Sequence, residues 1–291
     1  MTVLEKARKA LRARFFIGAS HAARKRIEEF AAHETAVQNN YESEIVVSLT
    51  SYPGRFKHLD LTIKSLLAQR IKQDRTVLWV ATKDKPKLPT SVLRLEERGL
   101  EIRTCDDIRS YKKLIPSLRQ FPEATIITAD DDLYYPEHWL EWLLKAASPS
   151  GSHVICWRAH LAKFAPSGHV LSYADFDFDT EQTIAGTRST AIFPTGSGGI
   201  LYPPGTFSPE VLNEEAFMSL CPRADDVWFF WMARLAGRSH RRVAGHFEQV
   251  AWPGTQAGAL FHQNWIGGEN DMQMKQVENV YGCIPSERLP I

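Results

Sequence analysis

The sequence predicts an α/β protein in which a mainly parallel β-sheet is flanked by helices. Short apolar runs alternate with segments of helical periodicity through residues 44–147, an order typical of parallel sheets. The runs are rich in β-branched residues and too short for helices, which indicates buried strands. One of them, residues 124–129, ends in three consecutive aspartates, so one edge of the sheet should carry several carboxylates.

The elements of the first half follow one another closely. Strands are predicted at residues 44–50, 76–81, 100–104 and 125–129, because each is apolar and bounded by turn-forming residues. Apolar residues with helical spacing predict helices at 59–67, at 91–98 and around 111–120, the last interrupted by Pro116. Pro136 opens a further helix, since proline is well placed in a first helical turn.

The second half of the chain is less regular. After residues 148–151, strand-like runs at 153–157 and 199–202 are separated by loops rich in Gly, Thr and Ser. Helices are predicted at about 225–235 and at 269–281. We expect residues 1–40 to form a basic helical extension and residues 41–291 to form one domain with halves 41–147 and 148–291. The second half should pack against the same sheet.

Composition restricts the class of protein. The formal net charge is +1, so no global field favours nucleic acid. The four cysteines are widely spaced and form no CxxC pair, which argues against a zinc ribbon or a disulfide framework and favours a reducing compartment. No secretory segment or long uncharged stretch is present, so we expect no membrane span and a cytoplasmic location.

Residues 1–30 differ from the rest of the chain. They contain eight basic and three acidic residues, with apolar side chains scattered between them. A basic amphipathic helix can lie on an anionic membrane surface, which predicts peripheral contact with the inner face of a membrane. The alternative, which we favour, is a solvated helix packed on the domain or a simple tail.

The strongest chemical signal is the acidic cluster Asp130, Asp131 and Asp132. Three adjacent carboxylates repel one another, and a hard divalent cation with oxygen ligands is the natural counter-charge. An Asp-x-Asp pair after a strand suits Mg²⁺ or Mn²⁺ that also binds diphosphate oxygens. The alternative is a solvated acidic turn that caps the next helix. We favour the metal site, since three aspartates after a buried strand are less common than one.

A second acidic pair, Asp225 and Asp226, precedes the apolar helix predicted at 225–235. Asp225 suits the N-cap, and Asp226 adds a favourable negative charge to the first turn. In the alternative interpretation, one of the two carboxylates is a general base that deprotonates a hydroxyl group. The two roles are compatible, and the sequence does not choose between them.

Three weaker signals complete the set. The glycine cluster at residues 195–199 would let the backbone approach a ligand, although it matches no Rossmann or P-loop pattern and a flexible loop is the alternative. His262 could supply an imidazole to the same metal, although a lone histidine is more often structural. Arg55, Lys112 and Lys113 lie near strand ends, where cations bind diphosphate oxygens or remain solvated.

Taken in order, these segments resemble a glycosyltransferase of the GT-A fold, and more specifically the bacterial family-2-like enzymes of surface polysaccharide assembly. The similarity covers roughly residues 44–265. Two features depart from the family pattern, because the acidic pair is Asp-Asp instead of Glu-Asp and no QxxRW motif follows. The matching segments are residues 48–55 (SLTSYPGR), 111–116 (YKKLIP), 129–132 (ADDD), 198–202 (GGILY) and 225–228 (DDVW).

The resemblance implies a nucleotide-sugar donor, UDP-linked, in the first half and a saccharide or lipid-linked acceptor in the second. It implies Mn²⁺ or Mg²⁺ held by Asp130, Asp132 and His262, and it makes Asp226 the catalytic base of an inverting transfer. The residues that it implies for donor binding are Thr50, Tyr52, Arg55, Lys113, Asp130, Gly198 and Gly199.

Rival functions share some of these features. A metal-dependent phosphohydrolase can use Asp-x-Asp after a strand, but its nucleophilic aspartate follows the first strand, whereas here the acidic strand is the fourth. A glycoside hydrolase uses two carboxylates but needs no acidic cluster on one strand. A non-catalytic nucleotide- or sugar-binding module would keep the donor loop and has no need of Asp226. We therefore favour glycosyl transfer.

Overall fold

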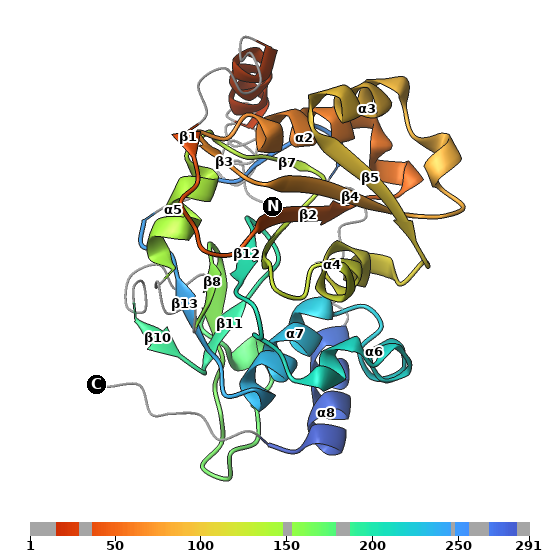
Figure 1. The fold of residues 1–291 in the computed structure, drawn as a ribbon. Coiled ribbons are helices and arrows are strands. Elements are labelled where there is room, and N and C mark those ends of the chain that lie inside the picture. The colour runs from red at the N-terminus through yellow and green to blue at the C-terminus, as the bar shows by residue number, and fades with distance from the viewer. Residues whose placement is uncertain are drawn as a thin grey trace, which may run out of the picture.

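The structure is a computed structural model that describes residues 16–28, 37–147, 153–178, 187–245, 248–255 and 268–283. An eight-stranded sheet forms the centre of this described part (Figure 1). In spatial order its strands are β10 (Arg188–Ser189), β13 (Ser239–Arg242), β8 (His153–Cys156), β12 (Ile200–Tyr202), β6 (Thr125–Ala129), β2 (Ile45–Thr50), β4 (Arg75–Ala81) and β5 (Leu100–Cys105).

The first half of the chain supplies the parallel part of this sheet. β2 runs parallel to both β4 and β6, and β4 runs parallel to β5. β12 lies antiparallel between β6 and β8, and β13 runs parallel to β8, so strands of the second half extend the same sheet. β10 adds an antiparallel strand at the edge. The predicted class, a mainly parallel sheet flanked by helices, is confirmed.

Helices cover both faces of the sheet (Figure 1). One face carries α2 (Leu59–Leu67), α3 (Thr90–Leu93) and α5 (Trp139–Ala146), and the other carries α4 (Ile115–Gln120), α6 (Glu214–Leu220), α7 (Asp225–Leu235) and α8 (Glu269–Tyr281). Short 3₁₀ helices are η1 (Pro53–His58), η2 (Lys85–Lys87), η3 (Arg94–Arg98), η4 (Arg109–Lys113), η5 (Tyr173–Asp175) and η6 (Pro209–Leu212). Two-stranded pairs are β1 (Val37–Gln38) with β3 (Ile71–Lys72), β9 (Ala159–Leu161) with β11 (Ile192–Pro194), and β7 (Leu133–Tyr134) with β14 (Val250–Ala251).

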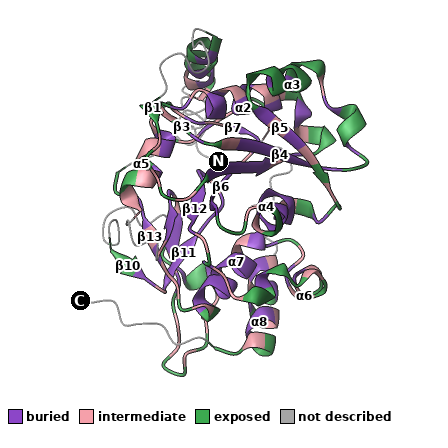
Figure 2. Cartoon of the chain, in the orientation of Figure 1, coloured by how far each residue is buried: buried purple, intermediate pink, exposed green. Residues whose placement is uncertain are grey.

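Alternate side chains of each central strand enter two different cores. In β2, Ile45 and Val47 pack with α2 and α5, whereas Val46 packs on the side of α4 and α7. Successive residues of a strand point to opposite faces, so both sets are buried, as Figure 2 shows for the central strands. Burial on both faces explains why the sequence has continuous apolar runs here instead of an alternating pattern.

Several predicted helices are shorter or divided in the structure. The helix expected at 91–98 consists of α3 followed by η3, and it ends at Gly99, whose φ of 96° is left-handed. The helix expected at 111–120 is η4 followed by α4, and Pro116 lies in the first turn of α4, where a missing N–H costs little. The helix after Pro136 begins only at Trp139.

Residues 16–28 of the basic N-terminal segment are helical and pack on the domain. Ala23 and Ile27 are buried in a small cluster with Leu61 of α2 and with Val250 and Trp252. This contact fits the interpretation of a helix packed on the domain, for this part of the segment. Residues 1–15 lie outside the described residues. No helix in the described ranges combines the length and apolar character that a membrane crossing requires.

Candidate active site

The acidic cluster follows β6, at the edge of the sheet where the parallel strands end. All five residues of β6 are buried between β2 and β12, so the chain can meet solvent only after Ala129. Asp130, Asp131 and Asp132 therefore occupy the first positions beyond the sheet, directly before β7. The predicted placement of carboxylates at a strand end is observed.

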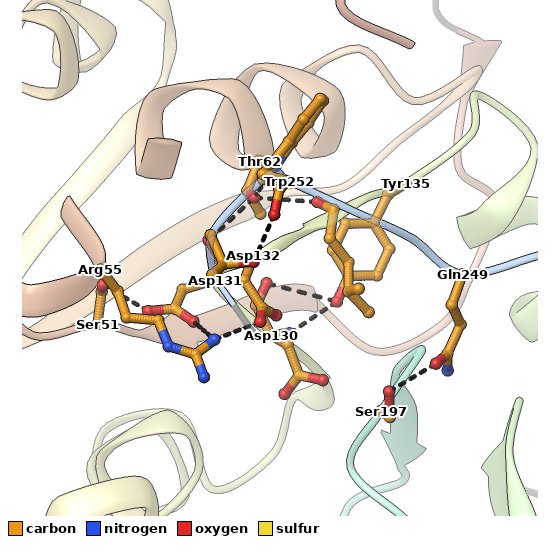
Figure 3. A network of polar contacts seen from close by, with 12 residues as sticks. Ser51, Arg55, Thr62, Asp130, Asp131, Asp132, Tyr135, Ser197, Gln249 and Trp252 are labelled. Atoms are coloured by element: carbon orange, nitrogen blue, oxygen red, sulfur yellow. Dashed lines mark hydrogen bonds and ion pairs between the residues drawn. The ribbon is translucent and has the colours of Figure 1, made fainter. Parts of the chain in front are cut away.

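Asp131 and Asp132 both contact Arg55 of η1 (Figure 3). The Arg55 Nη1 atom lies 3.3 Å from Asp131 Oδ1 and also donates to Asp132 Oδ2. Ser51 Oγ donates to the other Asp131 oxygen at 2.6 Å. Burial raises the pKa of Asp131 to about 6, against the opposing effect of Arg55, while the two carboxylates raise the pKa of Arg55 despite its own burial.

The Asp130 side chain points away from Arg55 and keeps partial solvent contact (Figure 3). Its backbone N–H donates to the hydroxyl oxygen of the buried Tyr135 at 2.7 Å. Loss of hydration raises the pKa of Asp130 to about 8; the neighbouring carboxylates add to this effect and Lys113 opposes it. The three aspartates thus face two environments, one neutralised by Arg55 and one short of positive charge.

The backbone of the acidic turn is held by two other parts of the chain. Thr62 Oγ1 of α2 donates to the carbonyl oxygens of Asp131 at 3.0 Å and Leu133 at 2.9 Å. The Trp252 backbone N–H donates to the Asp132 carbonyl at 3.0 Å, and its indole N–H donates to Thr62 Oγ1 at 2.8 Å. The segment around β14 therefore fixes the turn from a distant point in the sequence.

The second acidic pair begins α7, but the expected N-cap is wrong. The N-cap residue is Ala224, and Asp225 is the first helical residue. The Asp225 carboxylate is instead bound by Ser110 Oγ at 2.8 Å and by Lys113 Nζ at 2.9 Å. A buried ammonium group nearby is a stronger partner than a single helical N–H, since the attraction between full charges is large away from water.

Asp226 presents two different oxygens. Oδ2 accepts a hydrogen bond from the Gly196 backbone N–H at 3.0 Å. Oδ1 is buried and has no hydrogen-bond partner in the described part of the chain. Burial and the negative charge of Asp225 raise the pKa of Asp226 to about 6. One oxygen is anchored, and the other can accept a proton.

Lys113 links the two acidic groups. Its side chain is buried, and its pKa lies well above the usual range, because the negative charges of Asp225, Asp226 and Asp130 outweigh the cost of burial. Lys113 therefore stands within electrostatic reach of both the strand-end cluster and the start of α7. The sequence prediction gave Lys113 a contact with diphosphate, and in this structure its ammonium group binds Asp225.

The glycine cluster is required by close packing. A Cβ at position 196 would lie 2.6 Å from Lys113 Nζ and 3.1 Å from Asp226 Oδ1. A Cβ at Gly199, whose φ is 105°, would lie 2.5 Å from a ring carbon of Trp139. The Gly198 carbonyl accepts a hydrogen bond from the Trp139 indole at 2.6 Å. Glycine is needed here because backbone and charged side chains approach closely.

The remaining predicted residues are only partly placed at the site. Thr50 Oγ1 donates to the Trp79 carbonyl at 2.8 Å, so its hydroxyl proton is used by β4. Tyr52 is 49% exposed at the start of η1. His262 lies outside the described residues. Sequence reasoning missed Ser51, Ser110 and Tyr135, because single hydroxyl groups carry no motif.

The charge balance of the site suits a cation. Five carboxylates, those of residues 130–132 and 225–226, are accompanied by the directly bound cations Arg55 and Lys113. Oxygen ligands with excess negative charge are those that Mg²⁺ and Mn²⁺ take. Within the described ranges, however, no group of three or more His, Cys, Asp or Glu side chains could hold a metal ion. The described carboxylates thus supply oxygen donors and negative charge but do not by themselves form a metal site.

Comparison with known proteins places the chain among remote structural neighbours. No family model and no curated protein matches it. The mannosyltransferase PcManGT from Pyrobaculum calidifontis, in complex with GDP-Man and Mn²⁺, is 13% identical over 92% of this chain and 74% of its own, with a TM-score of 0.47. A 4-diphosphocytidyl-2C-methyl-D-erythritol synthase from Anaerococcus prevotii is 14% identical over 77% of this chain and 99% of its own, with a TM-score of 0.45.

S. aureus TarS 1–349 is a further neighbour, 11% identical over 70% of this chain and 58% of its own, with a TM-score of 0.42. By their names, the first of these neighbours is a mannosyltransferase and the second a synthase.

Proposed function

We propose that the chain is a glycosyltransferase that moves a sugar from a nucleotide-sugar donor to an acceptor hydroxyl. The observation that carries the proposal is the Asp226 carboxylate, which has one oxygen anchored by Gly196 and the other without a partner among the described residues. Lys113 connects this carboxylate electrostatically to the acidic strand end. Sugar transfer to a hydroxyl group requires a base for the hydroxyl proton and, close to it, a cation-binding site for the leaving group.

Asp226 would act as the general base. A pKa of about 6 leaves most of the carboxylate ionised at neutral pH while keeping it basic enough to accept a proton. The Gly196 N–H fixes Oδ2, so Oδ1 is the atom that would receive the acceptor proton. Lys113 would hold Asp225 in place while the proton passes from the acceptor hydroxyl to Asp226, a step that moves the negative charge from the carboxylate to the acceptor oxygen.

The donor would bind at the acidic edge. Asp130 and Asp132, with His262, would hold Mn²⁺ or Mg²⁺, which when bound neutralises the charge that develops on the diphosphate leaving group. Thr50, Tyr52, Arg55, Gly198 and Gly199 complete the set proposed for donor contact, and residues 41–147 and 148–291 form the donor and acceptor halves.

The finer assignment is also a proposal. In it, the chain is a family-2-like enzyme of bacterial polysaccharide assembly. The enzyme transfers a UDP-linked sugar, with inversion, to a saccharide or a lipid-linked acceptor. A cytoplasmic location, with peripheral membrane contact through residues 1–30, completes it. The exposed basic residues 24–26 on the packed helix support such contact.

Thermal unfolding with nucleoside diphosphates tests the proposal. We expect UDP to raise the melting temperature only when Mn²⁺ or Mg²⁺ is present. Asp132→Ala should abolish this shift, whereas Asp226→Asn should keep it and lose sugar transfer. Asp177→Ala, which removes an exposed carboxylate paired with Lys163, is the control and should behave as wild type. A shift with bare sugar or a phosphate monoester, and none with nucleotide plus metal, would contradict glycosyl transfer.

A further inference from the structure

Arg55 already binds an oxygen of Asp132, one of the aspartates proposed to hold a metal ion. Its Nη1 atom contacts one oxygen each of Asp131 and Asp132, and the three side chains are only 15, 11 and 8% exposed respectively. A guanidinium and a divalent cation in contact with the same carboxylate oxygen would repel each other strongly, because little water separates them. Arg55 and a metal ion on Asp132 are therefore competitors.

Arg55 is better placed to move than the other cation of the site. Lys113 is buried and held by Asp225 within a set of three carboxylates. Arg55 lies in η1, a short 3₁₀ helix with poorer hydrogen-bond geometry than an α-helix, beside the exposed Tyr52. The contacts that hold its guanidinium group are polar, with Asp131, Asp132 and Tyr52.

An arriving diphosphate would offer Arg55 an alternative partner. Both carboxylates are contacted through Nη1, and the Tyr52 side chain is a further hydrogen-bond partner of Arg55. A guanidinium carries five N–H donors on three nitrogens. Paired donors of this kind bind phosphate oxygens in a bidentate manner. Asp131 would keep its hydrogen bond from Ser51 after such a change, whereas the Asp132 oxygen would lose its contact with Arg55.

We propose that Arg55 is an exchange residue, which neutralises Asp132 in the donor-free protein and passes to the diphosphate of a nucleotide donor, leaving Asp132 to the divalent cation. The inference rests on the proposed function for the identity of the anion. It makes metal binding dependent on the nucleotide: Mn²⁺ alone binds weakly, and Mn²⁺ with UDP binds tightly. Arg55 thereby sets the order in which the two ligands bind.

Mn²⁺ titration followed by electron paramagnetic resonance, with and without UDP, measures this exchange. Arg55→Gln should tighten the binding of Mn²⁺ alone about tenfold or more, as expected when a charge-assisted contact no longer competes. UDP should then enhance Mn²⁺ binding less than it does in the wild type, because only the ligands that the diphosphate itself offers remain. Arg75→Gln is the matched control, since Arg75 also bridges two carboxylates, Glu44 at 2.5 Å and Glu101 at 2.7 Å, on another part of the surface. It should leave Mn²⁺ affinity unchanged.

Unchanged or weaker Mn²⁺ binding by folded Arg55→Gln overturns the exchange, even if the wild type binds Mn²⁺ with UDP and the proposed function stands. Conversely, the wild type could bind no nucleoside diphosphate while Arg55→Gln binds Mn²⁺ more tightly. That result would contradict the assignment of a nucleotide donor and support competition between Arg55 and Mn²⁺ for Asp132. Arg55→Lys covers the case in which the Gln variant does not fold. It retains the charge without the bidentate geometry, so Mn²⁺ alone should bind as in wild type while the enhancement by UDP is smaller. Enhancement equal to that of the wild type overturns the exchange.

Discussion

Replacing Gly196 by alanine places a methyl group between Lys113 and Asp226. The new Cβ would lie 2.6 Å from Lys113 Nζ and 3.1 Å from Asp226 Oδ1, whereas ordinary contacts to a Cβ are 3.4–4 Å. The ammonium group must therefore retreat by about 1 Å in a packed site, where small overlaps already cost free energy. Lys113 has little freedom to do so, since it is buried and bound to Asp225 at 2.9 Å.

The expected cost follows from the contact that is lost. A hydrogen bond to a charged group contributes about 1.5–3 kcal/mol, so the free energy of unfolding of Gly196→Ala should fall by about that amount in urea titrations. The turnover number should fall by about 10²-fold, because a displacement of about 1 Å at a reacting group has that effect. Binding of UDP with Mn²⁺ should change less, since Gly196 contacts Asp226 and not the strand-end carboxylates.

Gly18→Ala provides the control for this substitution. Gly18 lies in the helix at 16–28 with no heavy atom within 4 Å of the added Cβ. Its replacement should leave turnover unchanged and stabilise the helix by about 0.5–1 kcal/mol. If Gly196→Ala unfolded at the same urea concentration as wild type and turned over normally, the close approach of Lys113 and Asp226 would not exist in solution.

Three further predictions concern charge and packing. Sugar transfer should slow about tenfold per pH unit below about pH 6, where Asp226 becomes protonated, and Asp226→Asn should abolish this limb of the pH–rate profile. The pKa of Asp130 is raised from 3.8 to about 8, so between these two pH values the folded state holds a proton that the unfolded state has released. The contribution of Asp130 to the free energy of unfolding therefore decreases as the pH rises from about 4 to about 8. Urea titrations should show this slope, at most about 1.4 kcal/mol per pH unit, reduced in Asp130→Asn and by Mn²⁺. Ile27→Ala should loosen the N-terminal helix and expose Trp252, seen as a red shift in tryptophan fluorescence and faster proteolysis near residue 27, whereas Ile17→Ala, at a position 52% exposed, should do neither.

The sequence was sufficient to place the acidic cluster but not its partners. An apolar, β-branched run followed by aspartates determines that carboxylates stand at a strand end, because local periodicity and burial decide that much. The partner of Asp132 is Arg55, 77 residues earlier, and the partners of Asp225 lie 112 and 115 residues earlier, at Lys113 and Ser110. Such pairings depend on how the helices cross the sheet, which no short pattern encodes.

The same limit explains the error at the start of α7. Aspartate before an apolar helix is favoured as an N-cap on local grounds, yet Asp225 lies one residue inside the helix and binds Lys113. A tertiary ion pair outweighed a local hydrogen bond. The glycine cluster was predicted to let the backbone approach a ligand, and that stays a prediction. The groups that lie close to it in the fold are Trp139 for Gly199 and Lys113 for Gly196, which no local pattern could reveal.

The burial of Lys113 also ties the stability of the protein to its proposed chemistry. Lys113 comes from the first half of the chain, whereas Asp225 and Asp226 come from the second. Removing the lysine would leave carboxylates buried without a counter-charge, which destabilises proteins by about 3–5 kcal/mol. The same ion pair holds η4 against the start of α7. The position of Asp226, the proposed base, therefore depends on an interaction that the fold itself requires.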